Sequence, residues 1–157
     1  MKPGAFTQMY VQLVFAVKRR EALLTKNIQS RVFEYISGIL TSMNNKSLIV
    51  NGTSNHIHIF FGLNPSCNVS DIVHDVKRNS TFLINKERLT YNRFSWQEGY
   101  GGFTYSRSQI DHVYRYILNQ ESHHKKETFH DEYVNILLEN EIDYDEQFLF
   151  DFWEDSL

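Results

Sequence analysis

The order in which hydrophobic periods follow one another is the feature that most constrains the fold of this chain. Residues 8–17 alternate apolar and polar side chains, which predicts a strand with one buried face. Residues 26–43 repeat apolar side chains every three or four positions, which predicts a helix capped by Thr25. Two strands are then predicted at 47–51 and 55–63, joined by a turn at 52–54. A second amphipathic helix after Ser70 and a short strand at 103–105 complete the order strand, helix, strand, strand, helix, strand.

This order is that of an α+β, ferredoxin-like split βαβ sandwich, an antiparallel sheet with helices on one face. We expect the other face to be free for a ligand. A further helix is predicted to begin near Ser108, where Ser108 and Asp111 form a capping-box pair, and to run past Gln120. A last helix is predicted over 127–140. We therefore expect one domain, residues 1–140, followed by an acidic, aromatic extension, residues 141–157.

Composition and the lack of long apolar stretches indicate the class of protein and its cellular compartment. The chain has 157 residues, of which 41% are hydrophobic, enough for one sizeable core. Cys67 is the only cysteine, so no disulfide can form within the chain. No apolar stretch approaches the ~20 residues that span a bilayer, and the first residues lack a signal-peptide pattern. The sequence predicts a cytoplasmic protein that is not inserted in a membrane.

Charge is divided unevenly along the chain. All 16 lysine and arginine residues lie in residues 1–126, which hold 8 acidic residues and so carry a net charge of +8, whereas residues 127–157 hold 11 acidic residues and no lysine or arginine. A body with this charge suits a polyanionic partner, because binding releases condensed counterions. The acidic end either serves solubility, restrains polyanion binding, or docks through its aromatic side chains. Those side chains are Phe148, Phe150, Phe152 and Trp153.

Two histidines mark a candidate metal site. His56 and His58 lie two residues apart on a predicted strand, so both side chains project from one face. Two imidazoles at this spacing can chelate one cation and leave positions open for a substrate. A solvated strand can carry the same pair by chance.

The predicted helix after Ser108 adds further polar groups. Its apolar stripe places Tyr114 in the core, whereas Tyr116 falls on the polar side with Gln120, whose amide oxygen can bind a metal. The remaining apolar positions are Ile110, Val113, Ile117 and Leu118, and the remaining polar ones are His112, His123 and His124. Taken alone, the polar side is better explained as a solvated surface than as a site.

Together, these motifs resemble one protein family. The chain is similar to the single-tyrosine HUH transposases of bacterial insertion sequences, which are TnpA-like, and to their REP-associated relatives. Ile57 stands for the bulky apolar residue between the two histidines, and Tyr116 precedes Gln120 by four residues as the family pattern requires. The resemblance also includes residues 13–19 and 96–101.

The resemblance implies metal-dependent cleavage and rejoining of single-stranded DNA at hairpin-bearing element ends. Tyr116 would be the nucleophile and form a 5′-phosphotyrosine. His56, His58 and Gln120 would hold a divalent ion, Mg or Mn. The family also implies a homodimer in which the tyrosine helix of one subunit completes the metal site of the other. His112 and His123 are candidates to assist the phenol.

Possible DNA contacts are less specific than these motifs. Phosphate contacts are expected from basic residues, and stacking on unpaired bases is expected from aromatic residues. The basic residues are Lys77, Arg78, Arg88 and Arg93, and the aromatic ones are Phe60, Tyr100 and Tyr105.

Three alternative functions stay open. A catalytically inactive or regulatory ferredoxin-like nucleic-acid-binding module would share the fold, but the presence of all four site residues argues against it. An RRM-type RNA-binding domain reads bases with aromatic side chains on the face where this chain has histidines. A closed structural zinc site is disfavoured because one cysteine and one histidine pair do not complete it.

Overall fold

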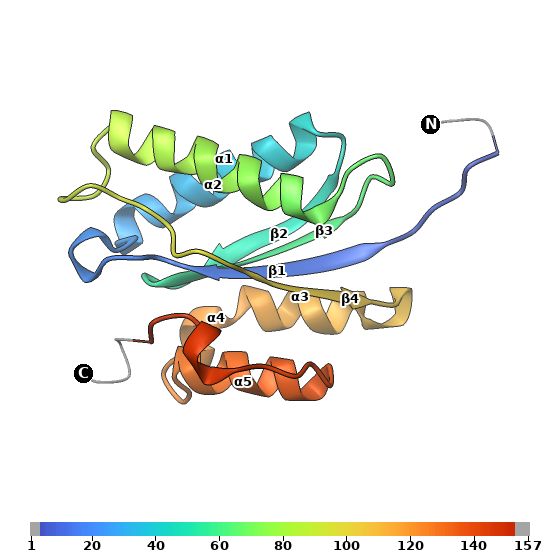
Figure 1. Cartoon of the computed structure of the whole chain (residues 1–157). Coiled ribbons are helices and arrows are strands. Elements are labelled where there is room, and N and C mark those ends of the chain that lie inside the picture. Colours follow the sequence, from blue (N-terminus) through green and yellow to red (C-terminus); the bar gives the residue numbers. More distant parts are fainter. Residues whose placement is uncertain (1–3, 153–157) are drawn as a thin grey trace.

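The computed structural model describes residues 4–152, and its centre is a four-stranded antiparallel sheet with strand order β2-β3-β1-β4 (Figure 1). This is the predicted α+β, ferredoxin-like arrangement. The strands are β1 (Tyr10–Ala16), β2 (Lys46–Gly52), β3 (His56–Gly62) and β4 (Gly101–Tyr105).

Two long helices, α1 (Lys26–Ser42) and α2 (Val69–Lys86), cover one face of the sheet (Figure 1). Thr25 occupies the predicted N-cap position of α1, although its side chain makes no capping hydrogen bond. Helix α2 is capped by Asn68, whose side chain accepts from the backbone N–H of Asp71. Both helices bury their apolar stripes in the core, so the predicted helical periods are confirmed.

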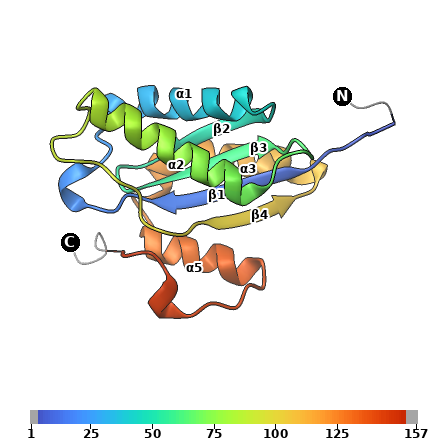
Figure 2. The ribbon, with the colours of Figure 1, turned by 45° about the horizontal axis from the view of Figure 1, so that its top comes forward.

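The opposite face of the sheet is covered as well. Helices α3 (Ile110–Leu118), α4 (Gln120–His123) and α5 (Phe129–Glu139) form a second layer there (Figures 1 and 2). All β1 residues from Val11 and all β3 residues up to Phe61 are buried, on both faces of the sheet. The expectation of a free ligand-binding face is therefore wrong, because α3 packs on Phe60 and Phe129 of α5 stacks on His56.

The start and end of α3 differ from the sequence prediction. Its capping box is made by Ser106 and Gln109 around a 3-10 turn at Arg107–Gln109, and not by Ser108 and Asp111. The predicted continuous helix is interrupted at Asn119, whose φ of −96° and ψ of 22° are not helical. Tyr116 and Gln120 consequently belong to two successive helices.

The extension after Asn140 docks on α5. Phe150 is 8% exposed, and its ring lies 5.0 Å from that of Tyr133 and 5.9 Å from that of Phe129, measured between centroids. The backbone N–H of Asp151 donates to Gln97 Oε1 at 2.8 Å. Phe148 is 80% exposed, and the predicted docking of Trp153 lies outside the described residues. Two further 3-10 turns lie at Arg20–Ala22 and Glu146–Phe148.

No helix within residues 4–152 combines the length and the hydropathy needed to cross a membrane.

Candidate active site

The histidine pair projects from β3 toward the second helical layer. Ile57 and Ile59 point to the other side, into the core beneath α1 and α2, which follows from the period of a strand. The His56 and His58 ring centroids are 5.2 Å apart, and neither residue is exposed to solvent. Gly52 allows β2 to pass close beside this point, because a Cβ there would lie 2.2 Å from the carbonyl oxygen of His56.

Tyr116 faces the histidine pair from α3. Its ring centroid lies 5.9 Å from that of His58, and the side chain is half-buried. Tyr114 is 39% exposed on the outer side of the same helix, so its expected place in the core is wrong. The reason is that Val113 and Ile117 make the buried contact with Phe60 on the sheet, with Ile110 and Tyr116 packed beside them. Tyr114 and Leu118 instead line an open depression beside β2.

Gln120 joins the same cluster from α4. It is fully buried, and its Oε1 lies 3.1 Å from His56 Nε2. The structure therefore brings together His56, His58, Tyr116 and Gln120, the four residues that carried the sequence-based site.

A fifth residue, Glu132 on α5, was missed from the sequence. Its Oε1 lies 3.2 Å from His56 Nε2 and 3.4 Å from His58 Nε2. Its Oε2 accepts hydrogen bonds from the Tyr116 hydroxyl and, at 2.8 Å, from Gln120 Nε2. His124 Nε2 lies 2.7 Å from Oε1. A sequence signal for Glu132 exists, because it interrupts the apolar stripe of α5 that contains Phe129, Tyr133 and Ile136.

Burial and the carboxylate shift the ionisation of these groups. Burial lowers the pKa of His56 to about 4, so its imidazole is neutral at pH 7. Burial would raise the pKa of the Glu132 carboxyl, but the histidines around it outweigh that effect and lower the pKa below its usual range. Burial, followed by the Glu132 charge, raises the pKa of the Tyr116 phenol well above its usual value. The cluster thus holds a carboxylate, a neutral imidazole and a protonated phenol.

The donor set around His56 suits a cation. Asn55 Oδ1 lies 2.7 Å from His56 Nδ1, which places the imidazole proton on Nδ1 and leaves a lone pair on Nε2. That lone pair faces two acceptors, Gln120 Oε1 and Glu132 Oε1, at 3.1 and 3.2 Å. Two ligands about 2.1 Å from one ion lie about 3.0 to 3.4 Å from each other for octahedral or tetrahedral angles. His56, His58 and Glu132 offer ligand atoms that lie within 4.8 Å of one another.

A cavity of about 290 Å³ reaches Tyr116 and Glu132. His112 and His123, the two candidates to assist the phenol, also line it. His123 Nε2 lies 2.6 Å from Glu127 Oε2 and 3.9 Å from Glu132 Oε2, and its ring centroid lies 5.0 Å from that of Tyr116. With Glu127, Glu132 and Glu139 in its wall, the cavity is acidic, and a phosphate entering it would need a cation to offset repulsion.

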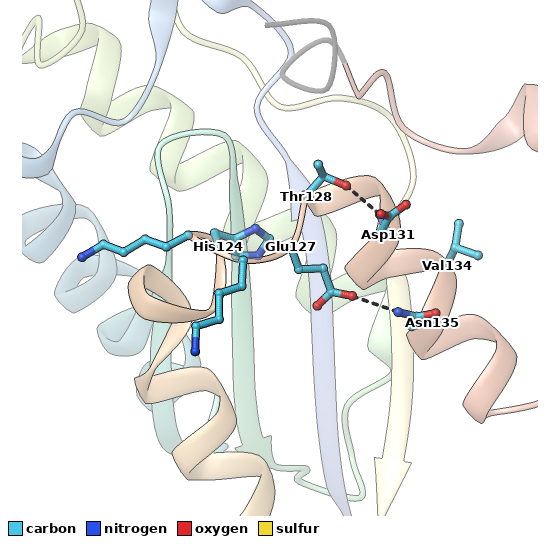
Figure 3. A pocket seen from close by; sticks show the side chains of 8 residues that line it. His124, Glu127, Thr128, Asp131, Val134 and Asn135 are labelled. Atoms are coloured by element: carbon cyan, nitrogen blue, oxygen red, sulfur yellow. Dashed lines mark hydrogen bonds between the residues drawn. The ribbon is translucent and has the colours of Figure 1, made fainter.

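A wider depression of about 830 Å³ lies along the segment between α4 and α5 (Figure 3). Within its wall, Asn135 Nδ2 donates to Glu127 Oε1 at 2.8 Å, and the backbone N–H of Asp131 donates to Thr128 Oγ1 at 3.1 Å. Tyr116, His56 and His58 do not line it, and His124 is the lining residue that contacts Glu132. We therefore place the chemistry in the smaller cavity.

The expected DNA-contact residues are scattered. Lys77 Nζ donates to the carbonyl oxygens of Gln97 and Gly99 at 2.8 and 2.7 Å, and burial lowers its pKa to about 8. Phe60 is fully buried, so the expectation that it stacks on a base is wrong. The exposed members of the set are Arg78, Arg88, Arg93 and Tyr100, whereas Tyr105 is half-buried.

Comparison with known proteins gives a family and two structural neighbours. Residues 5–120 match the family described as "Transposase IS200 like". A candidate transposase from Deinococcus radiodurans superposes with a TM-score of 0.59 at 19% identity, over 76% of this chain and 96% of that one. A REP-associated tyrosine transposase bound to a REP hairpin superposes with a TM-score of 0.58 at 13% identity, over 79% of this chain and 74% of that one. No curated protein matches the sequence.

Proposed function

Because this chain belongs to the IS200-like transposase family, we propose that it cleaves and rejoins single-stranded DNA at hairpin-bearing ends, with Tyr116 as the nucleophile. One observation carries the proposal. The Tyr116 hydroxyl bonds to the same carboxylate, Glu132, whose other oxygen lies 3.2 and 3.4 Å from the two histidines. A nucleophile and a candidate metal centre thus share one carboxylate.

The proposed reaction is a transesterification. The Tyr116 oxygen attacks the scissile phosphorus, the phenol–phosphorus bond forms, and the bond to the 3′ oxygen of the preceding nucleotide breaks. The products are a 5′-phosphotyrosine and a free 3′-hydroxyl. Rejoining is the reverse attack by a 3′-hydroxyl, so no nucleotide cofactor is consumed. Glu132 Oε2 is positioned to receive the phenol proton, since it already accepts that hydrogen bond.

We propose that His56, His58, Gln120 and Glu132 hold a divalent ion, Mg or Mn. When bound, such an ion polarises a non-bridging phosphate oxygen and offsets charge that develops in the transition state. Imidazole ligands favour Mn over Mg. The neutral state of His56 at pH 7 leaves its lone pair available without the loss of a proton.

The expected homodimer with composite sites stays a prediction. Within one chain, Tyr116 and His58 already lie in ring contact, so the geometry of a single chain is compatible with an active centre of its own. Mixing a Tyr116→Phe subunit with a His56→Ala subunit tests whether the sites are composite. Only an exchange of tyrosine helices between subunits would restore an intact centre.

The proposed reaction is tested by adduct formation. The protein is incubated with Mn²⁺ and single-stranded oligonucleotides that carry the hairpins flanking its gene, and covalent protein–DNA adducts are resolved on denaturing gels. We expect Tyr116→Phe to abolish the adduct and Tyr114→Phe to retain it, because Tyr114 lies on the outer side of the same helix. An adduct that persists in folded Tyr116→Phe and disappears in Tyr114→Phe would contradict the proposal.

A further inference from the structure

Gln12 is a buried polar residue for which the proposed reaction has no role. It is 1% exposed on the central strand β1, in register between Phe60 on β3 and Phe103 on β4. Its side chain also lines the cavity of about 290 Å³ that reaches Tyr116, and a buried amide there costs free energy unless it is hydrogen-bonded. Its Nε2 lies 2.9 Å from His58 Nδ1, and its Oε1 accepts from the Tyr105 hydroxyl at 2.7 Å. A continuous chain of hydrogen bonds therefore runs from Tyr105 through Gln12 to His58.

These hydrogen bonds determine which nitrogen of His58 carries the proton. With Gln12 Nε2 donating to Nδ1, the proton of a neutral imidazole is on Nε2, which lies 3.4 Å from Glu132 Oε1. A nitrogen that binds a metal needs its lone pair, so metal binding through Nε2 requires the proton on Nδ1 instead. That proton then needs an acceptor on the β1 side.

Rotation of the Gln12 amide by 180° supplies the acceptor. Its Oε1 then accepts from His58 Nδ1–H, and its Nε2 donates to the Tyr105 oxygen, since a hydroxyl both donates and accepts. Both orientations give each end of the amide one hydrogen-bond partner in the same volume. An apolar residue at this position would leave the buried Nδ1–H without a partner, which disfavours the metal-binding tautomer.

The two histidines differ in this respect. The Nδ1 of His56 faces Asn55 Oδ1 at 2.7 Å and the Thr53 hydroxyl at 3.0 Å. That hydroxyl donates its proton to Asn55 Oδ1 at 2.8 Å, so both oxygens face Nδ1 as acceptors. His56 is thereby fixed with its Nε2 lone pair toward the cluster, whereas His58 has a partner that serves either tautomer.

We propose that Gln12 and Tyr105 are positioning residues that convert His58 from its Nε2–H to its Nδ1–H tautomer when a divalent cation binds, through a flip of the Gln12 amide. The inference rests on the proposed metal site, but not on the cleavage of DNA. Its consequence is that a residue outside the ligand set controls metal affinity.

Imidazole ¹⁵N NMR of the full chain tests the tautomers directly. Without metal, we expect the Nε2–H form for His58 and the Nδ1–H form for His56. After addition of Zn²⁺, which is diamagnetic, we expect the Nδ1–H form for both. A His58 that is already Nδ1–H without metal, or that stays Nε2–H with Zn²⁺ bound at His56, would overturn the inference.

Mn²⁺ affinity, measured by calorimetry, provides the second readout. Gln12→Met keeps the length of the side chain and removes the acceptor, so we expect affinity to fall about 10- to 100-fold, as is usual for the loss of a partner behind a ligand. Gln12→Glu restores an acceptor and should bind Mn²⁺ at least as tightly as the wild type. Tyr105→Phe leaves the flipped amide without its second partner and should weaken binding to a smaller extent. Gln97→Met is the matched control, a buried amide outside the cluster, and should leave affinity unchanged.

The outcomes separate this inference from the proposed function. If folded Gln12→Met, checked by circular dichroism, binds Mn²⁺ within twofold of the wild type, the positioning role is refuted while the metal site stands. If Gln12→Met does not fold, Gln12→Glu and Tyr105→Phe decide, and a Gln12→Glu protein that binds tenfold more weakly refutes the role. A wild type that binds Mn²⁺ without cleaving hairpin DNA refutes only the proposed reaction. A wild type that binds no Mn²⁺ refutes both.

Discussion

We expect the metal-free protein to lose stability in mild acid through His56. The imidazole is fully buried, stacked at 3.8 Å between centroids on Phe129, and burial lowers its pKa from 6.5 to about 4. Below pH 6.5 the unfolded chain therefore takes up a proton that the folded protein does not accept until about pH 4. The free energy of unfolding is therefore unaffected by the titration of His56 well above pH 6.5, and it decreases as the pH falls toward 4. Each pKa unit corresponds to about 1.4 kcal/mol, so the whole shift amounts to about 3 kcal/mol, of which about 2 kcal/mol is lost between pH 7 and pH 4.5.

The assay is urea unfolding in EDTA at several pH values between 7 and 4.5, for the wild type and for His56→Gln. Carboxyl groups titrate in both proteins, so the difference between their pH slopes isolates His56. We expect the wild type to lose about 2 kcal/mol more than His56→Gln over this range. His74→Gln is the control, since the His74 side chain is 73% exposed, and it should follow the wild type. If the wild type instead gains stability relative to His56→Gln in acid, Glu132 holds a protonated His56, and the argument for a free lone pair on Nε2 fails.

Three further predictions concern the site and the extension. Alanine at His56, His58 or Gln120 should abolish adduct formation and leave hairpin binding, measured by fluorescence anisotropy, largely intact. Normal metal-dependent cleavage by Gln120→Ala would show that Gln120 is not a metal ligand and only packs in the cluster. In the subunit-mixing experiment, the composite site predicts that activity returns after verified exchange, and continued inactivity would indicate centres built within one chain. Phe150→Ala should lower the free energy of unfolding by about 3 kcal/mol, as expected for a buried aromatic side chain, and a change below about 0.5 kcal/mol in urea unfolding would contradict docking of the extension.

Truncation after Asn140 tests whether the acidic extension restrains DNA binding by its charge or stabilises the fold. If it restrains DNA binding by charge, the shortened chain should stay folded and bind single strands more tightly at low salt. If it serves as a structural clasp, as the burial of Phe150 favours, circular dichroism and sizing should show unfolding or aggregation. A folded, truncated chain with unchanged affinity at low salt would contradict the electrostatic restraint.

Most of the fold could be predicted from periodicity, but the packing of the last helices over the sheet could not. The alternation around Leu13 and the helical repeat around Val32 predict elements that pack in one core, and these elements are present. The polar residues of β1 and β3, such as Gln12, indicate an exposed face because local pattern does not report what covers it. That cover comes from α3, α4 and α5, which follow β3 only after α2 and β4, and it depends on tertiary packing.

The same limit explains which site residues were found. His56, His58, Tyr116 and Gln120 follow short spacings that a strand or a helix turns into neighbours. Glu132 belongs to a segment where acidic residues are common, so composition placed it among solvated charges. Its position within the apolar stripe of α5 is the signal that separates it from its exposed neighbour Asp131.

The two-sided burial of β3 has a consequence for how this protein tolerates sequence change. His56 and His58 lie in a strand whose alternate residues fill the main core, so most replacements there cost folding stability as well as chemistry. Tyr116 is half-buried at the edge of the cluster formed by Phe60, Val113 and Ile117, so its loss removes a peripheral contact and leaves the buried centre in place. A lineage released from selection for cleavage would therefore lose the nucleophile first and keep the histidine pair, yielding folded descendants in which the metal site outlasts the reaction.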